Sequence, residues 1–169
     1  FGATYVHKRR GPTLLGVEEV RARSGALRVA SRDLLVGSPA LLTDDADVIR
    51  ELAADLSALR AESTPAGLKE LDRLALRIET LQGLLALAEG DSLAAAAVLE
   101  RVGGGVATLE LRALRGGLAA FDPERDATRA AGDLSGAIAR GARRAEVRAW
   151  RAAVRSRSGL AGRADEVLA

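Results

Sequence analysis

Residues 81–102 read LQGLLALAEGDSLAAAAVLERV, and this stretch carries the clearest information about the fold. Leucines recur every three or four positions up to Ala88, a spacing typical of an amphipathic helix. The pair Gly90-Asp91 then ends this helix and can cap a second one, which we expect over residues 92–102. A turn this short predicts two helices that run antiparallel and pack side by side.

The helix that enters this turn has the clearest start signal in the chain. Ser63-Thr64-Pro65 supplies a capping hydroxyl ahead of a proline, which suits the first position of a helix. We therefore expect one helix from there to Ala88. Its apolar stripe and those of its neighbours predict a core that includes Leu71, Leu74, Ile78, Leu81, Leu85, Leu99 and Leu114.

Similar periodicity predicts further helices on both sides of this pair. Upstream, we expect a helix over residues 14–36 that is interrupted at Ser24-Gly25, and a helix capped by Thr43 with its apolar face at Val48, Leu52, Leu56 and Leu59. Downstream, we expect helices over about 106–120, 123–140 and 142–156, and a short last helix that ends at Ala169.

The composition supports an all-α fold of seven or eight helices, built from stacked antiparallel hairpins. Apolar residues make up 48% of the 169 residues and aromatic residues only 2%, so the core is aliphatic. Without cysteine and with one histidine, the chain lacks disulfides, thiolate metal sites and cysteine nucleophiles. Arginine greatly outnumbers lysine, which a bacterial coding bias towards GC-rich codons explains better than a special use of the guanidinium group.

The hairpin also suggests a family. Gly83 and Gly90 lie seven residues apart, and Ala95 and Leu99 follow four residues apart. This pattern resembles the tetratricopeptide repeat, in which small residues let paired helices approach closely. Weaker echoes at 118–127 and 159–167 are unevenly spaced, and the usual tyrosine is replaced by Ala86. The resemblance implies a degenerate solenoid, and an irregular helical bundle is the alternative.

Glycines and charge suggest how the chain is divided. Gly103-Gly104-Gly105 predicts a hinge between an N-terminal layer, residues 13–102, and an arginine-rich C-terminal layer, residues 106–169. Residues 1–12 run from apolar and aromatic into the basic triplet Lys8-Arg9-Arg10, as after a membrane span on its cytoplasmic side, or as in a plain basic terminus. We expect a cytoplasmic location, with a membrane tether upstream of Phe1 as the alternative.

Few residues suggest chemistry. Asp44, Asp45 and Asp47, with Glu51 one turn on, could hold a divalent cation, but capping of a helix explains them better. The three glycines before a helix lack the strand and the lysine of a nucleotide-binding loop. His7 has no partner that would orient it as a base. The sequence therefore predicts a protein that is not an enzyme, with no catalytic residue, metal or cofactor.

The arrangement of charge is more informative than the net charge of +2. Residues 134–169 carry eight arginines and three acidic residues. Four of these arginines lie within about 60° of one another around one predicted helix, next to Trp150. They are Arg144, Arg148, Arg151 and Arg155. We call these four arginines the arginine ridge. An exposed tryptophan beside it would suit an acidic partner, whereas a core tryptophan would leave a solvated cationic face.

The sequence therefore predicts a non-catalytic module for protein–protein interaction or scaffolding, with an acidic protein partner at the arginine ridge and Trp150. A nucleic-acid-binding protein that uses the arginine-rich C-terminal third is the first alternative. The cytoplasmic part of a membrane-tethered assembly is the second. The sequence does not predict an oligomeric state.

Overall fold

The computed structural model describes residues 13–104 and 107–159, and this part of the chain is all-α. It contains eight α-helices and one 3₁₀ helix, η1, without a named strand. Their bounds are α1 Val17–Arg23, α2 Gly25–Val36, η1 Leu42–Asp45, α3 Ala46–Ala61, α4 Pro65–Ala88, α5 Ser92–Val102, α6 Leu109–Phe121, α7 Ala127–Ala139 and α8 Ala145–Arg157. The predicted fold class is confirmed. The last predicted helix lies outside the described residues.

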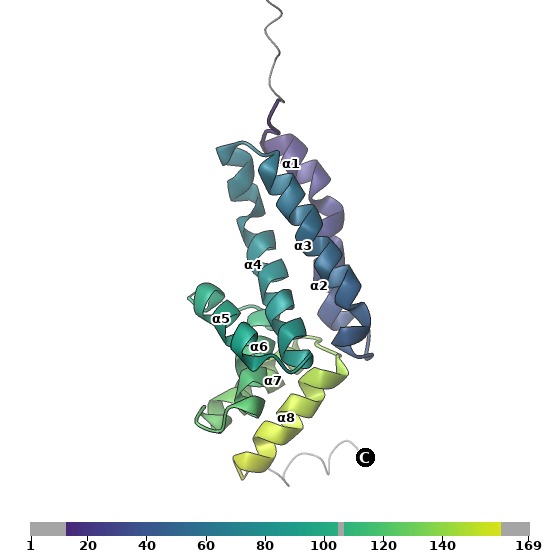
Figure 1. The fold of residues 1–169 in the computed structure, drawn as a ribbon. Helices are drawn as coiled ribbons and strands as arrows, with labels where there is room; N and C mark the ends of the chain where they lie inside the picture. The colour runs from purple at the N-terminus through teal and green to yellow at the C-terminus, as the bar shows by residue number, and fades with distance from the viewer. Residues whose placement is uncertain (1–12, 105–106, 160–169) are drawn as a thin grey trace, which may run out of the picture.

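The longest helix, α4, holds the fold together. It packs against α1, α2, α3 and η1, and also against α5 and α6 (Figure 1). Its start is as expected, because Pro65 occupies the first turn and the Thr64 hydroxyl accepts a hydrogen bond from the Gly67 N–H at 3.2 Å. We call α1–α3 with the part of α4 beside them the N-terminal region, and α5–α8 with the rest of α4 the C-terminal region.

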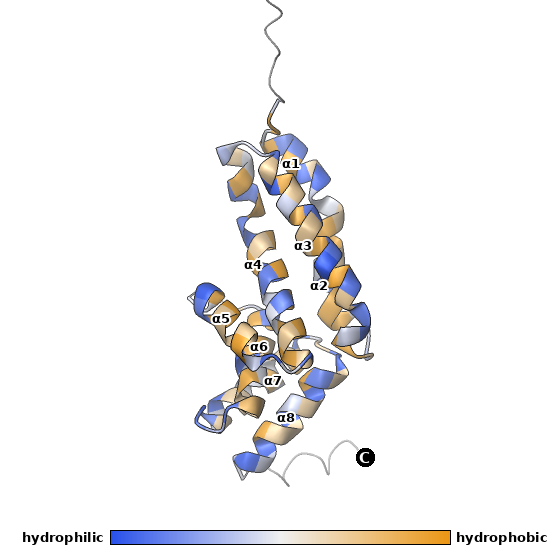
Figure 2. Cartoon of the chain, in the orientation of Figure 1, coloured by the Kyte–Doolittle hydropathy of each residue, from blue (hydrophilic) through white to orange (hydrophobic). Residues whose placement is uncertain are grey.

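The predicted core is mostly confirmed. Six of the seven leucine and isoleucine positions are buried, with exposed fractions of 5% or less: Leu71, Leu74, Ile78, Leu81, Leu85 and Leu114. Leu99 is only partly buried at the edge of the core. Hydrophobic and hydrophilic residues alternate along the helices (Figure 2), as expected for helices that bury one face. This burial is the main source of stability.

The interruption predicted near Ser24 is confirmed and has a local cause. Ser24 is fully buried and separates α1 from α2. Its hydroxyl donates to the Arg21 carbonyl at 3.3 Å and accepts from Arg28 Nε at 3.1 Å. A serine that bonds to nearby backbone competes with regular helix, and the helix is interrupted at this one residue.

The predicted start of the next helix is wrong. Thr43 lies within η1, and α3 begins at Ala46. The apolar face is set by this later start, so Ile49 is fully buried while Val48 is 42% exposed. Leu52, Leu56 and Leu59 are buried as expected. Thr43 and the first two aspartates belong to η1, so they do not set the start of α3 by capping it.

The C-terminal helices start later than the sequence suggests. α6 begins at Leu109, where the Thr108 hydroxyl accepts from the Leu111 N–H at 3.2 Å, rather than at Val106. α7 begins at Ala127, because Asp126 caps it through the Arg129 N–H at 3.0 Å. In both cases the capping side chain fixes the boundary, and hydrophobic spacing alone does not reveal it.

Small residues pack the C-terminal region closely. A Cβ on Gly116 would lie 2.6 Å from Leu134 Cγ of α7, and one on Gly117 would lie 2.6 Å from Trp150 Cε3 of α8. On α4, a Cβ on Gly83 would lie 2.9 Å from Val98 Cγ1 of α5. These glycines let α6 pack against α4, α5, α7 and α8 at once.

The repeat, the hinge and the two-layer division stay predictions. Helix lengths range from 7 residues in α1 to 24 in α4, and the described helices give no evidence of a repeated hairpin unit. Gly103 and Gly104 are exposed, whereas 105–106 and 1–12 lie outside the described residues. Among the helices that the structure describes, none is long and apolar enough to cross a membrane.

Candidate functional site

The tryptophan of the predicted site belongs to the core. Trp150 is 6% exposed, and its ring lies against the backbone of Gly117. In this position Trp150 cannot anchor a partner at the surface. The structure shows a core tryptophan, which was the alternative in the sequence analysis. The physical reason is that α6 carries no side chain at Gly117, which leaves a recess that the indole fills.

Arg144 is also buried, at 2% exposure, and so it does not form part of an exposed ridge. It lies at the N-cap of α8 and points towards the end of α2 and the following loop. Its Nε donates to the Leu34 carbonyl, its Nη1 donates to the Leu41 carbonyl at 3.2 Å, and its Nη2 pairs with the Asp45 carboxylate. The guanidinium therefore gives a partner to the Leu34 carbonyl in the last turn of α2, and it also binds the Leu41 carbonyl, which accepts from the Asp44 N–H as well.

Neighbouring residues strengthen this connection between the two regions. The Arg143 N–H donates to the Leu35 carbonyl at 2.8 Å. Glu146 Oε1 accepts from the Leu42 N–H at 2.6 Å. Together with Arg144, these contacts fasten the start of α8 to the segment 34–45. Arg144 is thus a structural residue.

The other three arginines of the ridge differ from one another. Arg148 is exposed on α8. Arg151 is partly buried, and its Nε donates to the Ser135 hydroxyl at 3.1 Å. Arg155 is partly buried and also has an interaction partner. The structure therefore does not bring the four arginines and Trp150 together on one open face.

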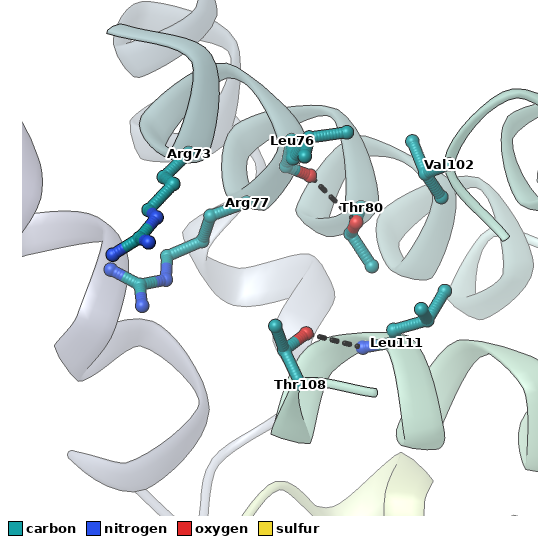
Figure 3. A pocket seen from close by; sticks show the side chains of 7 residues that line it. All are labelled: Arg73, Leu76, Arg77, Thr80, Val102, Thr108 and Leu111. Carbon is teal, nitrogen blue, oxygen red and sulfur yellow. Dashed lines mark hydrogen bonds between the residues drawn. The ribbon is translucent and has the colours of Figure 1, made fainter. Parts of the chain in front are cut away.

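A different surface offers a better binding geometry. A groove of about 490 Å³ opens between α4 and α6, close to the end of α5 (Figure 3). Its lining residues are Arg73, Leu76, Arg77, Thr80, Val102, Thr108 and Leu111. We call it the α4–α6 groove. Leu76 is 44% exposed at its wall, so a large aliphatic side chain is open to solvent there.

Two arginines at one side of the groove give it a positive charge. Figure 3 shows Arg73 and Arg77 side by side, apart from the apolar wall. Arg77 Nε lies 3.1 Å from Glu110 Oε1, and the Glu110 side chain is only 7% exposed. Arg73 is exposed and forms no ion pair with any residue that the structure describes. One guanidinium is thus held by a buried carboxylate while the other is free to bind.

The spacing of these residues was a signal that our sequence analysis missed. Leu76 and Arg77 each lie three or four residues from both Arg73 and Thr80, so the four residues share one face of α4. That face lies away from the leucine stripe that defines the core. The contribution of α6 could not be found in this way, because Thr108 and Leu111 are brought there only by the packing of α6 on α4.

The acidic cluster near the start of α3 has structural roles. Asp45 pairs with Arg144, and Asp47 pairs with Arg50 at 3.2 Å. Across residues 13–104 and 107–159, no group of three or more histidine, aspartate or glutamate side chains is placed to hold a metal ion. His7 lies outside the described residues.

Comparisons with protein-family models, with curated proteins and with solved structures give no match to this chain. The functional argument therefore depends on the geometry of the chain itself.

Proposed function

We propose that the protein is a non-catalytic module for protein–protein interaction and that it binds its partner at the α4–α6 groove. The observation that carries this proposal is an open apolar groove with an unpaired arginine beside it. Binding surfaces commonly combine an apolar recess, which takes up an anchor side chain, with charged groups around it.

The groove fits a particular kind of partner segment. Its walls are apolar at Leu76, Val102 and Leu111, so burial of an aliphatic or aromatic side chain there would supply most of the affinity. Arg73 would pair with a carboxylate a few residues away on the same segment. The partner that we infer is therefore a short acidic segment with one large apolar side chain.

Nucleic acid is the alternative that the sequence left open. The arginine-rich surface predicted to bind nucleic acid is less suited to that role, because Arg144 is buried and Arg151 donates a hydrogen bond to Ser135. A groove with apolar walls and one free arginine also offers few phosphate contacts. The two functions differ in their response to salt, because phosphate neutralisation gives a steep fall of affinity with salt concentration.

A photo-crosslinking residue at position 76 in the full chain tests the proposal in cells. Position 93 is a matched control, because Leu93 is also an exposed leucine, 83% exposed on α5, and does not line the groove. We expect one protein to crosslink from position 76 and not from position 93. The crosslink should be lost in the Arg73→Glu variant.

The purified partner then allows a quantitative measurement. Leu76→Asp should weaken binding by about tenfold or more, since it removes apolar burial of a large side chain. Leu93→Asp should leave binding unchanged. Equal effects of the two variants, or binding that depends on salt as steeply as phosphate contacts require, would contradict the proposed site.

A further inference from the structure

A second feature, unrelated to the groove, lies between α6 and α7. Two arginines of α6, Arg112 and Arg115, pair there with Asp133 of α7, and a third, Arg140 directly after α7, lies with Arg112 at Gly136. We call these residues the α6–α7 arginine cluster. The α6 and α7 helices lie side by side in the lower part of Figure 1.

The carboxylate neutralises this cluster only in part. Asp133 lies 3.2 Å from Arg115 Nε and 3.8 Å from Arg112 Nη1. Its side chain is 12% exposed, and those of the two arginines are 27% and 28% exposed. Arg140 is not among the partners of Asp133; its Nη1 donates to the Gly136 carbonyl at 3.3 Å. The cluster therefore has three positive charges and one negative charge.

The guanidinium groups converge at a glycine. A Cβ on Gly136 would lie 3.1 Å from Arg112 Nη1 and 3.3 Å from Arg140 Nη1. Both groups thus lie over the same part of α7, although like charges in close proximity repel each other. Glycine within a helix lowers helix stability relative to alanine, and here its lack of a side chain leaves room for both arginines.

Hydrogen-bonding groups in the cluster remain without partners. Arg112 Nε is buried, and no acceptor in the described part of the chain bonds to it. Arg115 Nε is buried in an ion pair with Asp133 Oδ2, and neither atom of this pair forms a hydrogen bond. Arginine donors that are withdrawn from water and lack an acceptor are costly, whereas an anion with several oxygens would satisfy them. Excess positive charge and unsatisfied donors thus point to the same missing group.

We propose that the α6–α7 arginine cluster binds a phosphate group, as free phosphate or as a small phosphate monoester. A phosphate presents several acceptor oxygens and up to two negative charges, so it can engage more than one guanidinium and reduce their repulsion. Asp133 holds Arg112 and Arg115 in place for the anion. The absence of a side chain at Gly136 lets the Arg112 and Arg140 guanidinium groups lie there together, where they bind the anion.

Titration of the full chain with inorganic phosphate, followed by NMR, tests this proposal. The amide signal of Gly136 should shift in a saturable manner, while that of Gly83, buried between α4, α5 and α6, should not. Sodium chloride at matched ionic strength controls for screening. Adenosine monophosphate is the second probe, and tighter binding than phosphate would identify a nucleotide monoester as the source.

Two glycine variants on one helix provide a matched comparison. Gly136→Ala introduces a methyl group against two guanidinium groups and should weaken phosphate binding by about fivefold or more. Gly132→Ala has no atom within 4 Å of the new Cβ, so it should leave the affinity unchanged. Both variants increase helix propensity, so a difference between them reports the site itself.

Arginine variants complete the test. Arg112→Gln and Arg115→Gln should each weaken phosphate binding by about tenfold, and Arg148→Gln on the exposed face of α8 should not. If Arg112→Gln does not fold, Arg115→Gln and Gly136→Ala still decide the outcome. A shift equal to that produced by chloride, or equal affinity in all variants, would overturn the proposal.

Discussion

The N-terminal and C-terminal regions reach a packed core in different ways. In the N-terminal region, large side chains such as Val20, Leu35 and Ile49 are buried in the core, and a close glycine contact occurs at Gly67, where a Cβ would lie 2.9 Å from Val20 Cγ2. In the C-terminal region, Gly116 and Gly117 let side chains of the neighbouring helices, such as Leu134 and Trp150, pack directly against the backbone of α6. Buried leucines and isoleucines recur periodically in the sequence, so they can be recognised there. Glycines that permit close helix contact do not change the hydrophobic periodicity, so this pattern does not reveal them.

This difference predicts opposite sensitivities to changes in side-chain size. Truncation should be costly where large side chains fill the core. Enlargement should be costly where glycines permit close contact. Three sets of variants test this contrast, and each is measured as the free energy of unfolding in urea with circular dichroism as the readout.

The largest effect is expected for truncation of a core isoleucine. Ile78→Ala removes a side chain that is 1% exposed on α4 and should lower the free energy of unfolding by about 2–5 kcal/mol. Leu76→Ala on the same helix is the control. Because Leu76 is 44% exposed, its truncation should lower the free energy of unfolding much less. A loss below about 0.5 kcal/mol for Ile78→Ala would show that the α4 stripe is not a core.

The next effect concerns the connection between the two regions. Arg144→Met keeps much of the side-chain volume but leaves the Leu34 carbonyl and the Asp45 carboxylate without their partner, while the Leu41 carbonyl keeps only the Asp44 N–H. We expect a loss of about 2–4 kcal/mol, because Arg144 is buried while Asp45 keeps some contact with water.

A double-mutant cycle separates the ion pair from the carbonyl contacts. Asp45→Asn alone removes only the charge partner of Arg144, so it should cost less than Arg144→Met. If the two single variants cost the same and their effects do not add, the carbonyl contacts contribute little. In that case the start of α8 would be held to α2 mainly by the ion pair.

A smaller effect is expected for enlargement at a glycine contact. Gly117→Ala places a methyl group 2.6 Å from the Trp150 ring and 2.8 Å from Leu87 Cδ2, and should cost about 1–3 kcal/mol despite its better helix propensity. Gly132→Ala, with open space around its Cβ, should instead stabilise by up to about 1 kcal/mol. Stabilisation by Gly117→Ala would contradict the close packing of α6 against α8.

Part of the candidate site was also visible in the sequence. The face of α4 that carries Arg73, Leu76 and Arg77 follows from their spacing alone. The partner face on α6 does not follow from the sequence, because α6 begins at a cap set by Thr108 and is brought to α4 by packing between distant residues, for example at Gly83. The predicted site at Arg144 and Trp150 differs from the structure for the same reason. The spacing of residues along a helix predicts which of them share a face, but it does not predict whether another helix packs over that face.

The sequence by itself determined the helical class, the bounds of α4 and α5, the Gly90-Asp91 turn and most of the core around Ile78. These features depend on local propensity, capping and periodicity, which act within a few residues along the chain. Only the tertiary structure decided that Arg144 is a buried cap for α2, that Trp150 fills the recess at Gly117, and that the α4–α6 groove stays open. Each of these depends on contacts between segments that are far apart in sequence, and no local pattern encodes which segments will meet.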